Sequence, residues 1–223
     1  MNVVRFLHAS LCLLTLAPLA GLAFAEDAPA SPEAIVQRVS DDLLQLIDES
    51  SGYAKEDPER FFVEVEALLA PSVDFRGFAR GVMAVHYKRA SDEQRERFTE
   101  TFKWGLVRTY ALALTEFKDG ELVMLADDRP APNPRRKNVK MEIRTGSGET
   151  YPITYSMKLG KDEIWRLGNI IVNGVNIGLT YRSQFASAVQ DQQYEGDLDR
   201  VIEAWAEVLE ADESGPPGLV EGT

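Results

Sequence analysis

The spacing of apolar residues changes from the period of a helix to that of a strand near Gly120. Before Gly120, apolar residues recur at intervals of three and four, the spacing of amphipathic helices. After it, several segments alternate between apolar and polar residues, which is typical of β-strands with one buried face. A run of helices followed by a run of strands predicts an α+β domain in which the helices cover the apolar face of the sheet.

Four strands are expected after this point, at about residues 122–126, 139–145, 151–159 and 164–172. In the second and third strands, the alternating apolar residues are Val139, Met141, Ile143, Ile153, Tyr155, Met157 and Leu159. Antiparallel pairing places all of them on one face and the intervening polar residues on the other. We expect a single domain with a curved four-stranded antiparallel sheet, whose concave face is covered by helices to form a cone.

The fourth strand belongs to residues 163–185, EIWRLGNIIVNGVNIGLTYRSQF. Trp165 and Leu167 share one face of its first half, but after Gly168 the strand is apolar on both faces. A bulge or bend at Gly168 explains this change. Asn173-Gly174 predicts a turn because both residue types tolerate positive φ, and a helix is expected a few residues later.

The expected helices have recognisable starts. Ser31 is a candidate N-cap before Pro32, and a second helix begins near Pro58. A third covers residues 74–87, and the capping box of residues 91–94 opens the longest helix, to about residue 117. A last helix begins near Asp197. The first two helices are interpreted as packing elements.

Residues 1–25 predict a cleavable secretory signal peptide. They carry Arg5, an apolar run over residues 11–24, and Ala23-Phe24-Ala25 before an acidic residue. The apolar run is broken by Pro18 and is short for a membrane anchor, which is the competing interpretation. Cleavage is expected after Ala25, leaving a domain over residues 26–211 and a disordered tail over residues 212–223.

Charge excludes some partners. The chain has 24 Lys and Arg against 36 Asp and Glu, a net charge of −12, and removal of the signal peptide makes the balance more negative. Nucleic acids and anionic membrane surfaces attract basic proteins, so neither is an expected permanent partner.

Candidate catalytic and metal-binding groups are few. The one cysteine, Cys12, lies in the signal peptide, and His86 is the one histidine outside it. Thiol catalysis and a multi-histidine zinc site are therefore excluded for the exported chain. The sequence does not exclude acid–base catalysis by Asp74 or Asp119 together with a tyrosine. We expect no catalytic residue, no metal and no cofactor.

Three stretches and their order resemble a known family. They are VDFRGFARGV at residues 73–82, YKRASDEQRERF at 87–98 and WRLGNIIVNGVNIGLTYRSQF at 165–185. With the signal peptide, they are similar to the MlaC family of periplasmic phospholipid-binding proteins, also described as the toluene-tolerance Ttg2D family. The resemblance covers nearly all of the exported chain and implies an NTF2-like cone with phospholipid as cargo.

The resemblance also implies a role and partners. Members of this family carry phospholipid between an outer-membrane lipoprotein complex and an inner-membrane ABC transporter complex with a lipid-binding subunit, which maintains outer-membrane lipid asymmetry. A two-chain phospholipid hides roughly 30 methylenes at about 0.8 kcal/mol each, so unaided passage through water costs on the order of 20 to 25 kcal/mol. A carrier of this kind needs an apolar cavity.

We expect that cavity between the apolar face of the sheet and the helices over it, where methionine and aromatic side chains adapt to irregular acyl chains. Its expected lining is Phe78, Val82, Phe102, Leu106, Tyr110, Val139, Met141, Ile143, Ile153, Tyr155, Met157, Trp165 and Leu167.

Two alternatives stay open. The same fold could serve a small-molecule-binding module or an enzyme, with Tyr155 or Tyr110 as the polar group in the cavity. The apolar side chains could also fill a solid core of an exported interaction protein.

Overall fold

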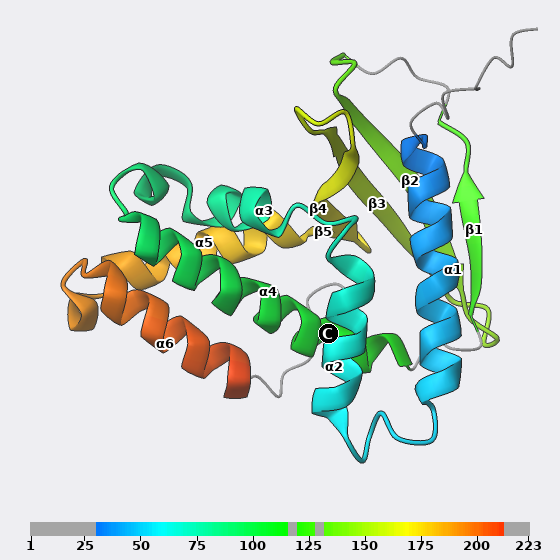
Figure 1. Cartoon of the computed structure of the whole chain (residues 1–223), viewed down its shortest axis with the longest axis horizontal. Helices are drawn as coiled ribbons and strands as arrows, with labels where there is room; N and C mark the ends of the chain where they lie inside the picture. Colours follow the sequence, from blue (N-terminus) through cyan, green and yellow to red (C-terminus); the bar gives the residue numbers. More distant parts are fainter. Residues whose placement is uncertain (1–29, 116–119, 128–131, 212–223) are drawn as a thin grey trace, which may run out of the picture.

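The computed structural model describes residues 30–115, 120–127 and 132–211 (Figure 1). The expected signal peptide at residues 1–25 and the expected tail at residues 212–223 lie outside the described residues, and both stay predictions. The end of the longest expected helix, near residue 117, lies outside them as well.

The described residues form helices first and the sheet second, except for two C-terminal helices. The elements are α1 (Pro32–Ser50), α2 (Pro58–Leu69), α3 (Phe75–Met83), the 3-10 helix η1 (Ala84–Lys88), α4 (Asp92–Thr115), β1 (Glu121–Leu125), β2 (Arg136–Arg144), β3 (Thr150–Leu159), β4 (Trp165–Val172), β5 (Val175–Asn176), α5 (Ile177–Gln190), η2 (Gln192–Tyr194) and α6 (Leu198–Ala211). This order confirms the predicted α+β class.

Local signals in the sequence account for two helix starts. The Ser31 hydroxyl accepts from the Ala34 amide at 3.1 Å and begins α1. At the start of α4, the Gln94 amide donates to the Ser91 hydroxyl at 3.1 Å, and the Ser91 amide donates to Gln94 Oε1 at 2.9 Å. This reciprocal pair is the predicted capping box.

The strands form one antiparallel sheet in the order β1-β2-β3-β4-β5. Four strands were expected, and the structure adds the two-residue strand β5. Asn173 and Gly174 adopt φ values of 48° and 81°, so the chain turns tightly and brings Val175 opposite Val172. The predicted turn is confirmed, and the fifth strand is its consequence.

A β-bulge interrupts the pairing of β3 with β4. Ser156 pairs with Asn169, but the next residue, Met157, pairs with Leu167, so Gly168 is the extra residue. This confirms the bulge predicted at Gly168. It also returns the following apolar residue, Ile170, to the face that carries Leu167, opposite Tyr155.

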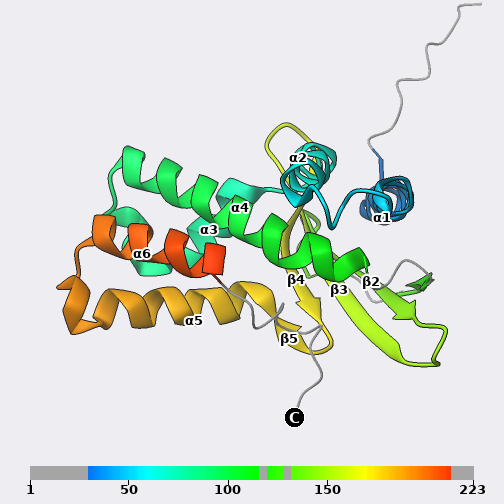
Figure 2. The ribbon, with the colours of Figure 1, turned by 90° about the horizontal axis from the view of Figure 1, so that it is seen from below.

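Helices α1 and α2 lie over the apolar face of the sheet, together with the C-terminal half of α4 (Figure 2). Helices α3, α5 and α6 and the N-terminal half of α4 form a bundle beside the sheet (Figure 1). The concave face is thus covered as predicted, but by only part of the helical layer.

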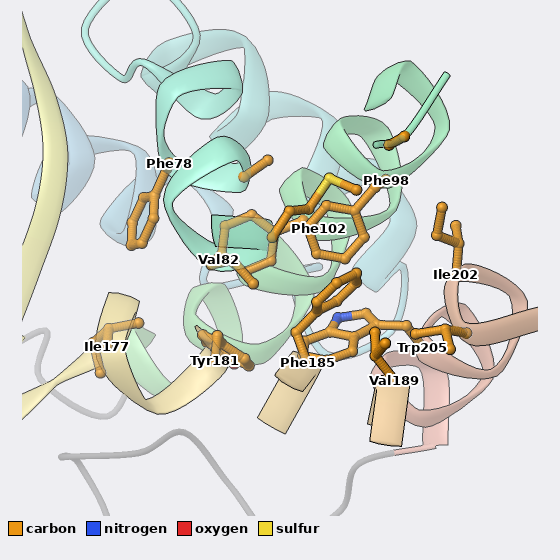
Figure 3. Packing of buried hydrophobic residues seen from close by; sticks show 14 of the residues in the cluster. Phe78, Val82, Phe98, Phe102, Ile177, Tyr181, Phe185, Val189, Ile202 and Trp205 are labelled. Carbon is orange, nitrogen blue, oxygen red and sulfur yellow. The ribbon is translucent and has the colours of Figure 1, made fainter. Parts of the chain in front are cut away.

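The bundle has a densely packed aromatic core (Figure 3). The Phe98 ring lies 4.8 Å from that of Phe185 and 5.7 Å from that of Trp205, both in edge-on geometry. The Phe102 ring lies 5.4 Å from that of Tyr181. Such contacts add to the stabilisation that comes from burial alone.

Candidate functional site

A cavity of about 200 Å³ lies between the apolar face of the sheet and helices α1, α2 and α4. Residues Phe75 and Phe78 of α3 and Ile177 of α5 close it on the side of the bundle. The lining described by the structure contains no charged side chain, and its polar members are Ser40, Ser72, Tyr110 and Tyr155. A space with an apolar lining accepts apolar groups.

Eight of the thirteen residues expected to line the cavity do so. They are Phe78, Leu106, Tyr110, Ile143, Ile153, Tyr155, Met157 and Leu167. Strand pairing explains why the sheet residues meet there, because Tyr155 pairs with Ile170 and Met157 with Leu167 on one face.

The structure places the other five expected residues elsewhere. Val82 and Phe102 are fully buried in the aromatic core of the bundle, because helices α5 and α6 cover them directly. Val139 and Met141 are fully buried under α1, which contacts this part of β2 closely. Trp165 packs at the edge of that same cluster.

Helices α1 and α2 contribute lining that was not expected from the sequence. Ile35, Val36, Val39 and Leu43 of α1, with Val65 and Leu69 of α2, face the cavity. Their helical periodicity showed that they are buried, but periodicity is the same for a helix over a cavity and a helix over a solid core. Both helices were therefore interpreted as packing elements.

The two tyrosine hydroxyls of the lining are both engaged. Burial is the larger cause of the raised pKa of Tyr110. The neighbouring Tyr181, whose hydroxyl is hydrogen-bonded to that of Tyr110, raises this pKa further. Burial also raises the pKa of Tyr155, and a hydrogen bond from Ser40 acts in the opposite direction. Both phenols are therefore protonated at neutral pH.

Two further candidate catalytic groups, Asp74 and His86, lie outside the cavity lining. Asp74 caps α3 by accepting from the Gly77 amide at 2.9 Å. His86 lies on η1 with its ring 6.0 Å from that of Phe185. Asp119 lies outside the described residues. Within the described residues, no cluster of three or more His, Cys, Asp or Glu side chains is arranged to hold a metal ion, and no helix has the length and apolar character needed to cross a bilayer.

Comparison with a solved structure shows the same fold. The phospholipid-binding protein from Ralstonia solanacearum, solved in complex with a phospholipid, superposes with a TM-score of 0.72 at 23% identity. The match covers 81% of this chain and 99% of that one.

Sequence comparisons lead to the family. The toluene tolerance protein Ttg2D of Pseudomonas putida is 34% identical over 180 residues, covering 80% of this chain and 81% of the relative. The intermembrane phospholipid transport system binding protein MlaC of Haemophilus influenzae is 26% identical over 152 residues, covering 67% and 71%. The family description "MlaC protein" matches residues 37–207, which is most of the chain. The chain therefore belongs to the MlaC family.

Proposed function

We propose that this protein is a phospholipid carrier that holds the acyl chains of its cargo in the cavity between the sheet and helices α1, α2 and α4. The observation that carries the proposal is that cavity, which is apolar and free of charged lining among the described residues. Relatives named for phospholipid transport, and a structural neighbour solved with a phospholipid, support the same cargo.

The apolar lining favours an apolar occupant. An acyl chain in this space hides its methylenes from water, at about 0.8 kcal/mol for each methylene buried.

The cavity is small for a two-chain lipid. Ligand pockets usually have roughly 300 to 1,000 Å³, so complete enclosure of both chains requires α1 and α2 to move away from the sheet. Both helices lie over one face of the sheet (Figure 2), and residues of these helices and of the strands line the cavity.

We further propose where the carrier works. The expected signal peptide, cleaved after Ala25, sends the protein to the periplasm. Membership of the MlaC family supports exchange of lipid with an outer-membrane lipoprotein complex and with an inner-membrane ABC transporter complex that has a lipid-binding subunit. In this role the protein maintains outer-membrane lipid asymmetry without catalysis, metal or cofactor.

Mass spectrometry tests the cargo directly. The protein is purified from its native periplasm without detergent, and both its native mass and an organic extract are measured. About one phospholipid per chain supports the carrier. A lipid-free chain whose thermal midpoint does not change on adding phospholipid contradicts it, and then favours the small-molecule-binding module or enzyme on the same fold.

A further inference from the structure

A polar groove of about 710 Å³ lies where β2 begins and β3 ends. The two strands contribute four polar residues to its wall, which are Arg136, Asn138, Ser156 and Lys158. They alternate along the strands with the apolar residues Val139, Tyr155 and Met157. Because successive side chains of a strand point to opposite faces, the four polar residues belong to the face of the sheet opposite to the cavity. Met157 lines both the groove and the cavity.

Two cations lie opposite each other in this groove. Arg136 of β2 pairs with Lys158 of β3 in the antiparallel register, and both line the groove. Like charges directly opposite each other destabilise a sheet. This chain has a net charge of −12 and many carboxylates that could neutralise such a pair. An anion bound between the two side chains would replace their repulsion with attraction.

Arg136 differs from the basic residues on either side of it. Arg135 Nη1 lies 2.9 Å from Glu163 Oε1, and Lys137 Nζ lies 3.4 Å from Glu33 Oε1. Among the residues that the structure describes, the exposed Arg136 side chain has no hydrogen-bond or ion-pair partner. A guanidinium carries a planar fork of donors that fits two oxygens of one anion, and here that fork is available.

Lys158 and Asn138 add two further donors. Lys158 Nζ lies 3.9 Å from Asp74 Oδ2, and the other oxygen of Asp74 already accepts from the Gly77 amide at 2.9 Å. Asn138 Oδ1 accepts from the Ser156 hydroxyl at 3.1 Å, whereas Asn138 Nδ2 has no partner within the described part of the chain. The groove therefore presents a guanidinium, an ammonium and an amide donor.

Two carboxylates also belong to the groove wall, those of Asp74 and Asp127. Asp74 caps α3, and Asp127 Oδ2 lies 3.2 Å from Lys140 Nζ. Both carboxylates thus have protein partners, but they would still repel an extended acidic ligand that filled the whole groove. A compact anion beside Arg136 and Lys158 avoids them, so the lining favours a single phosphate group over an acidic peptide.

We propose that Arg136, Lys158 and the Asn138 amide bind a phosphate group. A phosphate accepts two parallel hydrogen bonds from a guanidinium and further bonds from other donors, which matches this set. The phosphate belongs either to the headgroup of the lipid cargo, because Met157 is common to the groove and the cavity, or to a soluble phosphate. In the first case the inference rests on the proposed function and deepens it.

Titration with inorganic phosphate tests the site. Delipidated full-length mature protein is titrated by isothermal calorimetry at low ionic strength, with sodium chloride as the reference for screening. Arg136→Gln and Lys158→Gln are each expected to weaken phosphate binding by roughly tenfold, the range of one hydrogen bond to a charged group. Without phosphate, both variants are expected to be at least as stable as the wild-type protein, because each removes the repulsion between the two cations.

Arg144→Gln is the matched control. Arg144 lies on the same strand and the same face as Arg136, and its Nη2 already lies 3.1 Å from Glu142 Oε2. This variant is expected to keep the wild-type affinity for phosphate. Absence of phosphate binding to the wild-type protein beyond the chloride reference, or wild-type affinity in Arg136→Gln, overturns the inference.

Loading with lipid identifies the source of the phosphate. The titration is repeated on protein loaded from vesicles of dioleoyl phosphatidylglycerol. Loss of inorganic phosphate binding in the loaded protein supports the site with the headgroup as its ligand, whereas equal binding by loaded and lipid-free protein supports the site with soluble phosphate as its ligand. Failure of the vesicles to load the protein contradicts the carrier function, and the titration of lipid-free protein still decides the phosphate site.

Discussion

Asn169 donates a hydrogen bond from Nδ2 to Oδ1 of Asn176 at 2.9 Å, and this contact joins β4 to the start of α5. The two side-chain oxygens then accept from the first amides of the helix, Asn169 from Gly178 at 2.9 Å and Asn176 from Leu179 at 3.0 Å. Helix N-termini leave such amides without intrahelical partners. The asparagine pair therefore fixes α5, and with it the aromatic bundle, to the sheet.

The close approach at Gly178 leads to the first prediction. A Cβ atom there would lie 2.5 Å from Asn169 Oδ1 and 3.1 Å from Phe78 Cε2. Gly178→Ala is expected to displace Asn169 and to lower the free energy of unfolding by about 1 to 3 kcal/mol, the cost of leaving polar groups unpaired. Urea denaturation measures the change.

Gly81→Ala is the matched control. Gly81 lies in α3, and a Cβ atom at this position would meet no neighbouring group of the described residues within 4 Å. Since alanine favours helix over glycine, this variant is expected to gain up to about 1 kcal/mol. Equal effects of the two substitutions would contradict the role assigned to Gly178.

Gln94 links the capping box of α4 to α6. The Gln94 Oε1 atom accepts from the Ser91 amide, and the Gln94 Nε2 atom donates to Asp199 Oδ2 at 2.8 Å. Ser91→Ala is expected to cost about 1 kcal/mol through the lost cap. Gln94→Ala loses the tether to α6 in addition and is expected to cost up to about 1 kcal/mol more. Chemical denaturation of both variants checks the order, and a smaller loss for Gln94→Ala would show that the tether contributes nothing.

Cavity and core respond oppositely to added volume. Val39→Phe extends a ring into the cavity, so it is expected to stabilise the lipid-free protein by about 1 kcal/mol while reducing bound lipid. Val82→Phe adds the same atoms to the dense bundle and is expected to cost about 1 to 3 kcal/mol. Thermal midpoints of delipidated protein and lipid per chain are the measurements. Destabilisation by both variants would indicate that no usable space exists beside Val39.

A charge in the cavity is expected to expel lipid. Met157 lines the cavity, and Met157→Glu places a carboxylate among apolar groups, where neither the charge nor an acyl chain is well accommodated. Lipid per chain should fall close to zero in soluble protein. Val63→Glu, on the exposed side of α2, is the control and should keep its lipid. A folded Met157→Glu protein with a full complement of lipid would remove Met157 from the binding site.

His86 makes stability depend on pH in a defined direction. Burial, helped by the charge of Arg89, lowers the pKa of His86 below its ordinary value of about 6.5. The unfolded chain therefore binds the proton first as pH falls, and stability is lost below about pH 6.5. Between about pH 7.5 and 5.5, the wild-type protein should lose more stability than His86→Gln. Parallel losses in urea denaturation would show that His86 does not contribute.

Local chemistry made several parts of this fold predictable. The side chains that cap the helices, those of Ser31, Ser91 and Gln94, are hydrogen-bonded to backbone amides within three residues. Short segments of sequence therefore determine where these helices begin. The Asn173-Gly174 turn depends on which residues tolerate positive φ. Gly168 was recognisable as a bulge because the alternation of β4 changes there. Each of these signals acts over a few residues.

The division between cavity and core was decided by tertiary structure. Ile143 faces the cavity while Met141, two residues earlier on the same face of β2, is covered by α1. Phe78 lines the cavity, but Val82, one helical turn later, belongs to the aromatic core. By itself the sequence determined which face of each element is buried, because that follows from periodicity. How closely another element approaches that face depends on side chains from distant parts of the chain, and only their packing leaves space for a ligand.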